Sequence, residues 1–406
     1  MSSREVEESA IPSSKVKSAI STLWVSSFVQ HSAVLIVLLG LPSLTSDLES
    51  SIFVTIWVIL GYAAVQQSLI VPLSRLGDLF GRKLIFVLGF VIVGVGGLVA
   101  AVSPTAEILV AARLFAGVGA AMSSGLGRAL IVDIAPRASR GRALGISTSG
   151  TAMGTLGGPA IGGLLLTVTS WRGVFAYLAL ADFIMIILVL IFIPKISNPR
   201  TSLRKFDWQG GATFSGGLIT SLLGLTWVGN PGVPIETSYL LFVISAISFA
   251  AFAFIETKKD SPMLDLKLFK IPQYGKAASI ALPAGMAVQP MPLIMVFYLQ
   301  SVMNLTPGET AAIIFVLPAV QLLDVLGGWA ADKIGSAIPM LFGLSVYSLT
   351  FLLLFLRAPV ATIPELMLYL GILGFGAIFT MTPLTSMALG SLPKNNLGVG
   401  AGLLHN

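Results

Sequence analysis

Twelve apolar segments, each about as long as a bilayer is thick, constrain this chain more than any other feature. A helix needs about 20 apolar residues to cross the hydrocarbon core of a membrane. Segments of this length lie at 20–44, 52–73, 84–103, 106–130, 143–168, 172–194, 210–229, 237–256, 276–300, 308–330, 337–357 and 364–390. They are too long for barrel strands and lack the alternation of period two. The sequence therefore predicts an all-α membrane protein with about twelve complete spans.

Composition supports this interpretation and narrows the chemistry. Of the 406 residues 55% are hydrophobic and 10% are charged, with a mean hydropathy of +0.92, whereas soluble domains carry about 25% charged residues. The absence of cysteine excludes disulfides and thiolate metal sites. Only two histidines, His31 and His405, argue against a histidine-based metal site. We expect no cofactor and no metal. Because no nucleophile–base set is visible, we also expect that the protein is not an enzyme.

The placement of basic residues predicts the orientation in the membrane. With the N-terminus in the cytoplasm, 20 of the 24 Lys and Arg residues fall in the N-terminal tail or in cytoplasmic loops. This bias is the one that cytoplasmic loops show, and it explains the net charge of +6 without nucleic acid as a partner. Residues 1–19 are polar and mixed in charge, which is typical of a soluble tail and not of a signal peptide.

The segment SRLGDLFGRK at 74–83 joins two of the spans and concentrates charge at the membrane surface. It resembles the signature loop GxLaDrxGrk of the major facilitator superfamily, with Ser74 in place of the first glycine. The resemblance implies a latch that holds the cytoplasmic side closed, formed by Gly77, Asp78, Gly81, Arg82 and Lys83. The residues alone allow Asp78 to cap a helix or to pair with Arg82. The alternative is an ordinary positive loop without a specific role.

Two further motifs lie inside spans. RLFAGVGAA at 113–121 resembles the helix 4 motif RxxqGxgaa of the superfamily, which implies a role for Arg113 in proton transfer; the alternative is an arginine that snorkels to the membrane surface. GTLGGPAIGG at 154–163 resembles the helix 5 motif of antiporters. Gly154, Gly158 and Gly162 form one flat helical face for close packing, and Pro159 bends the helix. The resemblance implies that this face packs between the two halves; generic packing is the alternative.

The spacing of a second, weaker loop, GWAADKIG at 328–335, indicates the branch. Because it follows the tenth span, the seventh and eighth spans look like an inserted pair, which resembles the fourteen-span drug/proton antiporter branch. We expect a tail at 1–19, a six-helix bundle at 20–194, two inserted helices at 195–275 and a C-terminal bundle at 276–406. That bundle would be incomplete, because NNLGVGAGLLHN at 395–406 resembles the start of a thirteenth helix. We interpret the chain as a truncated form.

One departure from the branch concerns the carboxylate that it usually carries in helix 1. Alignment on Leu41 and Pro42 places Ala33 at that position. The remaining candidates for proton handling are Asp324 and Asp182, two carboxylates at membrane depth, and His31. Each is alternatively a polar residue that hydrogen-bonds to a neighbouring helix.

Side chains suited to a broad apolar ligand gather in the second, ninth and tenth spans. Prolines that break helices often mark cavity-lining segments, and methionine adapts to varied ligands. The candidates for a substrate cavity are Trp57, Tyr62, Gln66, Gln289, Met295 and Gln321. Lipid contact, interfacial anchoring and hydrogen bonding between helices are the alternatives for these residues.

These expectations combine into a secondary active transporter of the plasma membrane. The resemblance implies proton-coupled export of amphipathic, drug-like molecules by alternating access. We expect a small-molecule substrate, protons and the bilayer as partners, no nucleic acid, and a monomer. The alternatives are a facilitator or importer of one metabolite, which the absent helix 1 acid favours, and a membrane sensor that binds ligand without transporting it.

Overall fold

A computed structural model describes residues 13–136, 140–194, 207–230, 232–259, 266–357 and 360–391. Throughout these residues the structure is helical and contains no strand. Twelve helices or helix groups among the described residues are long and apolar enough to cross a membrane. This agrees with the number and approximate bounds of the predicted spans, because both depend on the length and hydropathy of each segment.

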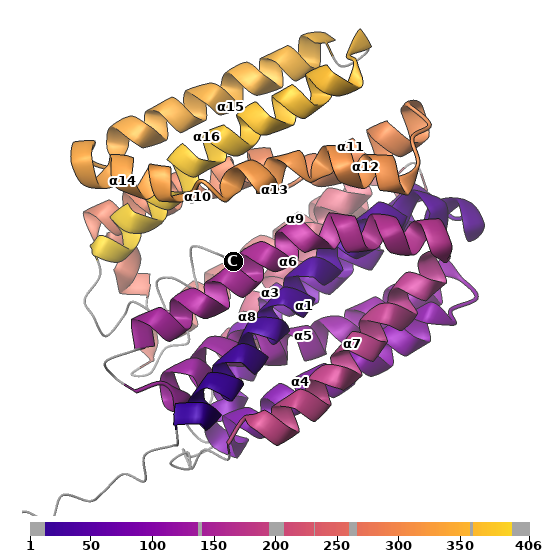
Figure 1. The fold of residues 1–406 in the computed structure, drawn as a ribbon. Coiled ribbons are helices and arrows are strands. Elements are labelled where there is room, and N and C mark those ends of the chain that lie inside the picture. Colours follow the sequence, from indigo (N-terminus) through magenta and orange to yellow (C-terminus); the bar gives the residue numbers. More distant parts are fainter. Residues whose placement is uncertain are drawn as a thin grey trace, which may run out of the picture.

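Six membrane-crossing helices make up the N-terminal half over the described residues, and they lie together as a bundle (Figure 1). The elements are α1 (Ser13–Asp47), the short α2 (Ile52–Thr55), α3 (Trp57–Phe80), α4 (Arg82–Ala101), α5 (Ala106–Ile134), α6 (Arg140–Val168) and α7 (Trp171–Phe192). Small residues let their backbones approach closely: a Cβ on Gly119 of α5 would lie 2.5 Å from the carbonyl oxygen of Gly89 in α4. In a bilayer such close contact is a main source of helix association.

The C-terminal half contributes four crossing segments over the described residues, and two of them are broken. The elements are η3 (Leu266–Lys270), α10 (Pro272–Val288), α11 (Met291–Phe297), the π-helical η4 (Tyr298–Val302), α12 (Pro307–Ile314), α13 (Val316–Gln321), α14 (Val325–Ile334), α15 (Ala337–Arg357) and α16 (Ile363–Gly390). One break falls beside Pro290, and another at Phe315, three residues before Pro318. The prolines therefore interrupt these spans as the sequence indicates, because proline lacks the N–H that continues a helix.

The contact of α14 with α16 gives a direct test of the packing of this half. A Cβ on Gly327 would lie 2.1 Å from the carbonyl oxygen of Ile378, whereas a Cβ on the adjacent Gly328 would meet its nearest neighbour, the Thr382 methyl, at 3.7 Å. We expect Gly327→Ala to destabilise the protein by about 1–3 kcal/mol, the cost of overpacking. Gly328→Ala should be neutral or slightly stabilising, because alanine favours helix. Thermal unfolding in detergent measures both; equal melting temperatures would contradict this packing.

The two halves contact each other near one end of the helices, which we call the closed end; it is the end at which α1 finishes. There α12 lies beside the last turns of α6 (Figure 1), and Gln300 of η4 donates a hydrogen bond of 3.0 Å to the carbonyl of Leu39 in α1. Leu38 and Leu39 share a core cluster with Met291 and Met295. At the opposite end, which we call the open end, α14 packs on α16 and α15 of its own half.

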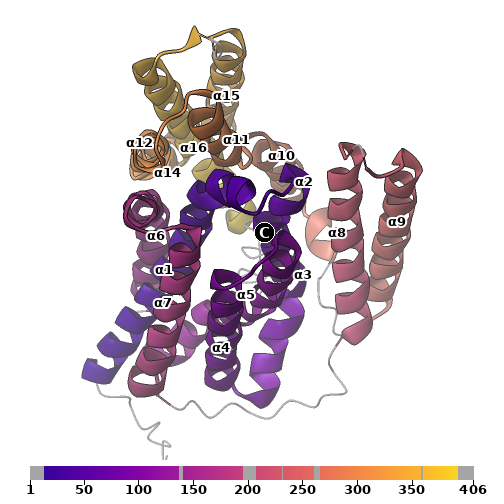
Figure 2. The same cartoon turned by 90° about the vertical axis from the view of Figure 1, so that its right-hand side faces the viewer.

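The helices α8 (Trp208–Val228) and α9 (Ile235–Lys258) form a hairpin beside the two halves (Figure 2). It packs on α3, where Ser215 donates a 2.9 Å hydrogen bond to the carbonyl of Ser68. Asp207 caps α8 by accepting from the Gly210 amide and pairs with Lys259 beyond α9. Burial opposes the charge of Asp207, but Lys259 and the Gly210 amide outweigh it and hold the pKa of Asp207 below its usual range. The ion pair therefore joins the start of α8 to the end of α9, at the end of the hairpin opposite its turn.

Candidate functional site

Arg113 lies inside the N-terminal bundle, where a charge is expensive and indicates function. Its side chain in α5 is buried, with the residue 6% exposed. The Nε atom donates a hydrogen bond of 2.9 Å to the carbonyl of Val58. The guanidinium lies over the ring of Tyr62, 3.9 Å from its centroid, and 5.7 Å from the centroid of Phe175. These contacts keep the arginine inside the bundle, which rules out the snorkelling alternative.

Asp182 supplies the opposite charge from the middle of α7. It is 5% exposed, and its charge interacts with that of Arg113. Within the described part of the chain no ion pair joins the two groups, and no hydrogen-bond donor reaches the carboxylate. A buried carboxylate without a donor is poorly stabilised in its charged form. The group is therefore suited to take up and release a proton.

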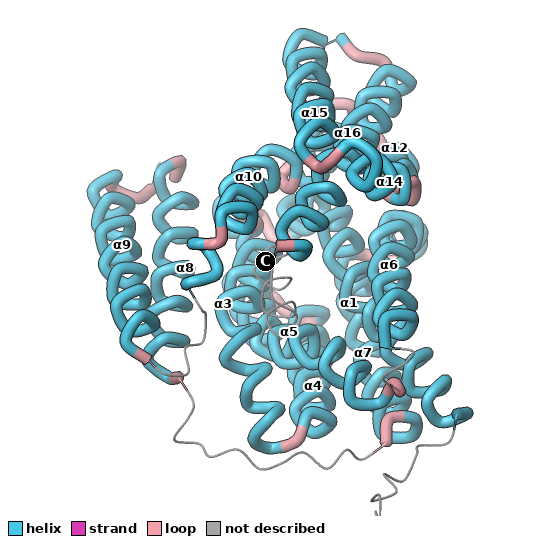
Figure 3. The backbone as a smooth tube through the Cα atoms, turned by 90° about the vertical axis from the view of Figure 1, so that its left-hand side faces the viewer, coloured by secondary structure: helices cyan, strands magenta, loops and turns pink. Residues whose placement is uncertain are grey.

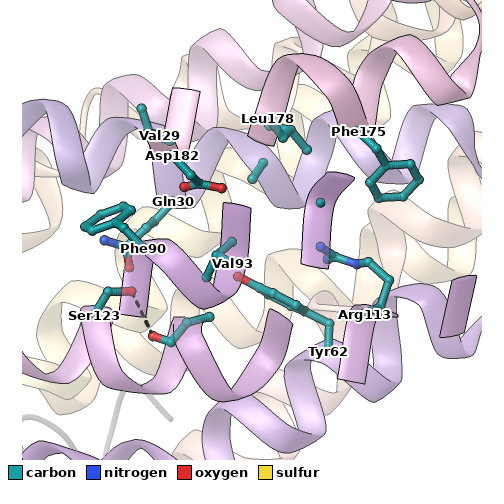
Figure 4. Close-up of a pocket in the computed structure, with 13 residues that line it drawn as sticks. Val29, Gln30, Tyr62, Phe90, Val93, Arg113, Ser123, Phe175, Leu178 and Asp182 are labelled. Carbon is teal, nitrogen blue, oxygen red and sulfur yellow. Dashed lines mark hydrogen bonds between the residues drawn. The ribbon is translucent and has the colours of Figure 1, made fainter. Parts of the chain in front are cut away.

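A small cavity separates the two charged groups. It has a volume of about 20 Å³, which is enough for one water molecule. Figure 4 shows Asp182 on one side and Arg113 on the other, with the Tyr62 hydroxyl between them. The lining comes from five helices of the N-terminal half: Val29, Gln30, Ala33, Tyr62, Phe90, Val93, Gly97, Arg113, Ala120, Ser123, Phe175, Leu178 and Asp182. Ala33, which stands where the branch carries its helix 1 acid, faces the same cavity.

The structure thus brings together two of the four candidates for proton handling. Arg113 and Asp182 share the cavity, whereas Asp324 lies in the other half, exposed at the junction of α13 and α14 beside Thr382. His31 is exposed on α1, with its Nδ1 atom 2.8 Å from the carbonyl of Ser27. Sequence reasoning treated the acids separately, and nothing in it indicated that α5 and α7 line one cavity.

The residues of the predicted latch lie at the open end, where α3 ends and α4 begins. Gly81 makes the sharp turn between these helices with a positive φ of 103°, a conformation that glycine adopts without steric cost. Arg82 pairs with Asp133 near the end of α5 at 2.6 Å, and Lys83 donates to the carbonyls of Leu190 and Ile193 at the end of α7. Asp133 was not among the predicted residues. The side chain of Asp78 lies outside the described part of the structure.

Gly77 has a simpler role in packing. A Cβ at this position would lie 2.5 Å from a methyl carbon of Leu126 in α5. The residue therefore permits close contact between α3 and α5 beside the turn.

The glycine face of α6 packs differently from the expectation. A Cβ on Gly154, Gly158 or Gly162 would lie 2.5–3.0 Å from backbone atoms of α1, so this face binds α1 of the same half and not the other half. Pro159 lies within this stretch of α6. The neighbouring Gly163 is the residue that meets the C-terminal half, at Ala311 and Gly308 of α12. Spacing indicates which residues share a face, but it does not indicate which helix that face contacts.

The candidates for a substrate cavity do not converge on one place. Tyr62 belongs to the Arg113 cavity, Met295 is buried in the cluster between the halves, and Gln66 donates to the Ser124 hydroxyl at 3.3 Å. Trp57 is half-buried at the closed end of α3, beside Gly61. Gln289 is exposed and Gln321 half-buried, each at a break in its span.

A model of the Major Facilitator Superfamily matches residues 23–405, nearly the whole chain. The chain belongs to this superfamily. Together with the apolar helices of the described residues, this match identifies an integral membrane protein of a transporter superfamily. The family match agrees with the all-helical fold and with the resemblance of the three sequence motifs.

Curated relatives include transporters of different substrates. The chain is 29% identical over 355 residues to the multidrug resistance protein Stp of Mycobacterium tuberculosis, covering 86% of this chain and 65% of that protein. It is 25% identical over 364 residues to the riboflavin transporter RibZ of Clostridioides difficile, covering 89% and 78%. The chain therefore spans about two thirds of the length of the first relative.

Solved structures support the same fold. A POT family transporter in complex with 5-aminolevulinic acid has a TM-score of 0.71 at 14% identity, covering 95% of this chain and 87% of that one. The xylose transporter XylE from E. coli, in a partially occluded inward open conformation, has a TM-score of 0.60 at 15% identity, covering 97% and 89%. At these identities the likeness concerns the fold alone.

Proposed function

We propose that the protein exports amphipathic small molecules across the plasma membrane in exchange for protons. The observation that carries this proposal is the cavity between Arg113 and Asp182. Both groups are more than nine-tenths buried, the carboxylate receives no hydrogen bond from the described residues, and the space between them admits a water molecule. Multidrug resistance among the named relatives supports export of drug-like cargo.

The coupling follows from the charge balance in this cavity. When Asp182 is ionised, it compensates the buried charge of Arg113; when it is protonated, the Arg113 guanidinium keeps the Val58 carbonyl and the rings of Tyr62 and Phe175 but no negative charge among the described residues. Because the cavity is lined by α1, α3, α4, α5 and α7, a change in its charge affects the packing of the whole N-terminal half. Protonation would thus bias the equilibrium between conformations open to opposite sides of the membrane.

The orientation and the branch belong to the same proposal. The positive-inside bias supports a cytoplasmic N-terminus and, with it, a cytoplasmic open end. In that orientation the conformation described above loads cargo from inside the cell. The hairpin of α8 and α9, which packs on α3 and stands beside both halves (Figure 2), supports an inserted pair and hence the fourteen-span drug/proton antiporter branch.

A second candidate is the facilitated transport or uptake of one metabolite. Two observations favour it: Ala33 leaves helix 1 without an acid, and one relative is named as a riboflavin transporter. This alternative predicts transport that is insensitive to a proton gradient.

Reconstitution into liposomes with an imposed pH gradient tests the proposal. Rhodamine 123 and 5-carboxyfluorescein serve as probes because they share a xanthene core and differ in charge. We expect at least one dye to accumulate against its concentration gradient, and accumulation to stop when a protonophore collapses the pH difference. Equilibration of either dye without accumulation would favour the facilitator, and the absence of any transport would favour the sensor.

A further inference from the structure

The hairpin of α8 and α9 carries two buried carboxyl groups that the proposed transport mechanism does not use. Asp207, at the start of α8, is 4% exposed, and Glu256, in the last turn of α9, is 3% exposed. In Figures 2 and 3, α8 lies between α9 and α3, so both groups belong to an element beside the N-terminal half. Acidic side chains are almost never buried so fully unless a partner stabilises them.

The two carboxyl groups meet beside Gly210. A Cβ on this glycine would lie 2.4 Å from Oε1 of Glu256 and 2.6 Å from Oδ2 of Asp207. Two oxygens that lie so near one point are close neighbours, and both atoms are buried. Ionised carboxylates only accept hydrogen bonds. Contact between these two oxygens is therefore favourable only when one of the groups carries a proton.

The contacts of Asp207 indicate which group carries that proton. Its Oδ1 atom accepts a 2.7 Å hydrogen bond from the Gly210 amide and pairs with Lys259. Both contacts favour the ionised form of Asp207. Its other oxygen, Oδ2, receives no hydrogen bond from the described residues. A protonated Glu256 supplies the donor that this buried oxygen needs.

The charged groups nearby on α9 and η3 are lysines. Lys258 places its ammonium over the ring of Phe254, 3.9 Å from the centroid. The short helix η3, which packs on α9, carries Lys267 and Lys270. All three lysines are exposed, so solvent weakens their effect on the buried carboxyl groups. The contact beside Gly210 is instead shielded from solvent, and the proton on Glu256 decides whether it is favourable.

The two acids lie next to the contact that holds the hairpin on α3. A Cβ on Gly211, the residue after Gly210, would lie 3.4 Å from the Cβ of Pro72. The charged residues of α3 nearest to Pro72 are Arg75 and Asp78, whose side chains lie outside the described part of the structure. A change of charge beside Gly210 therefore acts on the attachment of the hairpin to the N-terminal half.

We propose that Glu256 and Asp207 hold one proton between them, so that the base of the hairpin is a proton-binding site separate from the Arg113 cavity. The protonated Glu256 donates to Oδ2 of the ionised Asp207. When the proton leaves, two negative charges adjoin in a buried place, and the hairpin is held less firmly. This inference goes beyond the proposed function, because it needs neither cargo nor a gradient.

Glu256→Gln tests the inference through thermal unfolding of the full chain in detergent at about pH 5 and about pH 8. Glutamine donates the hydrogen bond of the protonated acid but has no proton to lose. An unfolded glutamate titrates near about pH 4.3. If the folded protein keeps this proton to a higher pH, the stability that it contributes is lost as the pH rises. We expect the variant to melt about 2–4 °C above the wild type at pH 8, and the two to melt nearly alike at pH 5.

Glu236→Gln is the matched control, because it makes the same substitution at an exposed residue in the first turn of α9. It should melt like the wild type at both pH values. In an Asp182→Asn background Glu256→Gln should have its full effect, since independent sites add; loss of the effect would overturn the separate site.

Three outcomes would overturn the shared proton. The first is a Glu256→Gln variant that melts with or below the wild type at pH 8. The second is a variant that does not fold, because an amide matches the protonated acid. The third is stabilisation of the wild type at pH 8 by calcium chloride that is absent from the variant, which would assign the two carboxylates to a cation. Unfolding is measured without a gradient, so failure of proton-coupled export would leave this result unchanged.

Discussion

Asp182→Asn is expected to uncouple transport from the proton gradient while leaving the protein folded and able to bind its cargo. Asparagine keeps the size of the side chain but has no proton to exchange, so the charge of the Arg113 cavity becomes fixed. Accumulation driven by a pH gradient should fall by about 5- to 150-fold, the range that corresponds to coupling free energies of 1–3 kcal/mol. Asp182→Glu should retain coupling. Dye accumulation in proteoliposomes measures the effect, with melting temperature as the check on folding.

An aspartate introduced in place of Ala33 would put a carboxylate in the same cavity as Asp182. Because Ala33 and Asp182 both line it, Ala33→Asp in the Asp182→Asn background should restore part of the coupling. Asp324→Asn is the comparison, since Asp324 lies in the other half and outside this lining. If Asp324→Asn uncouples transport and Asp182→Asn does not, then the assignment of the proton site to the N-terminal half is wrong.

The spans were predictable because each depends on local properties of the chain. Apolar length determines whether a helix crosses the bilayer. Pro290, beside Gln289, and Pro318, three residues after Phe315, mark two of the breaks in the C-terminal half. The placement of Arg113 inside an apolar segment also identified a functional candidate without any structure. These features need no knowledge of which helices are neighbours.

The pairing of residues was not predictable, because it depends on contacts between distant helices. Nothing in the spacing relates Arg113 to Asp182, 69 positions later, until α5 and α7 are placed around one cavity. Likewise, nothing in the spacing predicts that Arg82 pairs with Asp133, which lies near the end of a different helix. The periodicity of Gly154, Gly158 and Gly162 correctly gives a packing face, but the contact with α1 is a property of the assembled bundle.

Gly163→Leu is expected to open the closed end. A Cβ on Gly163 would lie 2.8 Å from the Cβ of Ala311 and 3.3 Å from the Cα of Gly308, so a leucine side chain has no room between α6 and α12. Overpacking of this kind costs about 1–3 kcal/mol. The strain disappears when the halves separate there. The equilibrium should therefore shift toward the conformation open at this end by roughly 5- to 150-fold, and the rate of transport should fall.

The absence of cysteine from the natural sequence makes this shift measurable with a single reporter. A membrane-impermeant maleimide should label the His31→Cys protein, with no other substitution, from the side on which α1 begins. With Gly163→Leu, labelling should also occur from the side on which α1 ends. Gly145→Leu is the control, because it lies on the same helix with no atom within 4 Å of its Cβ position. If Gly163→Leu labels like this control, then the contact of α6 with α12 does not keep the closed end shut, and the hydrogen bond from Gln300 to Leu39 becomes the contact to test.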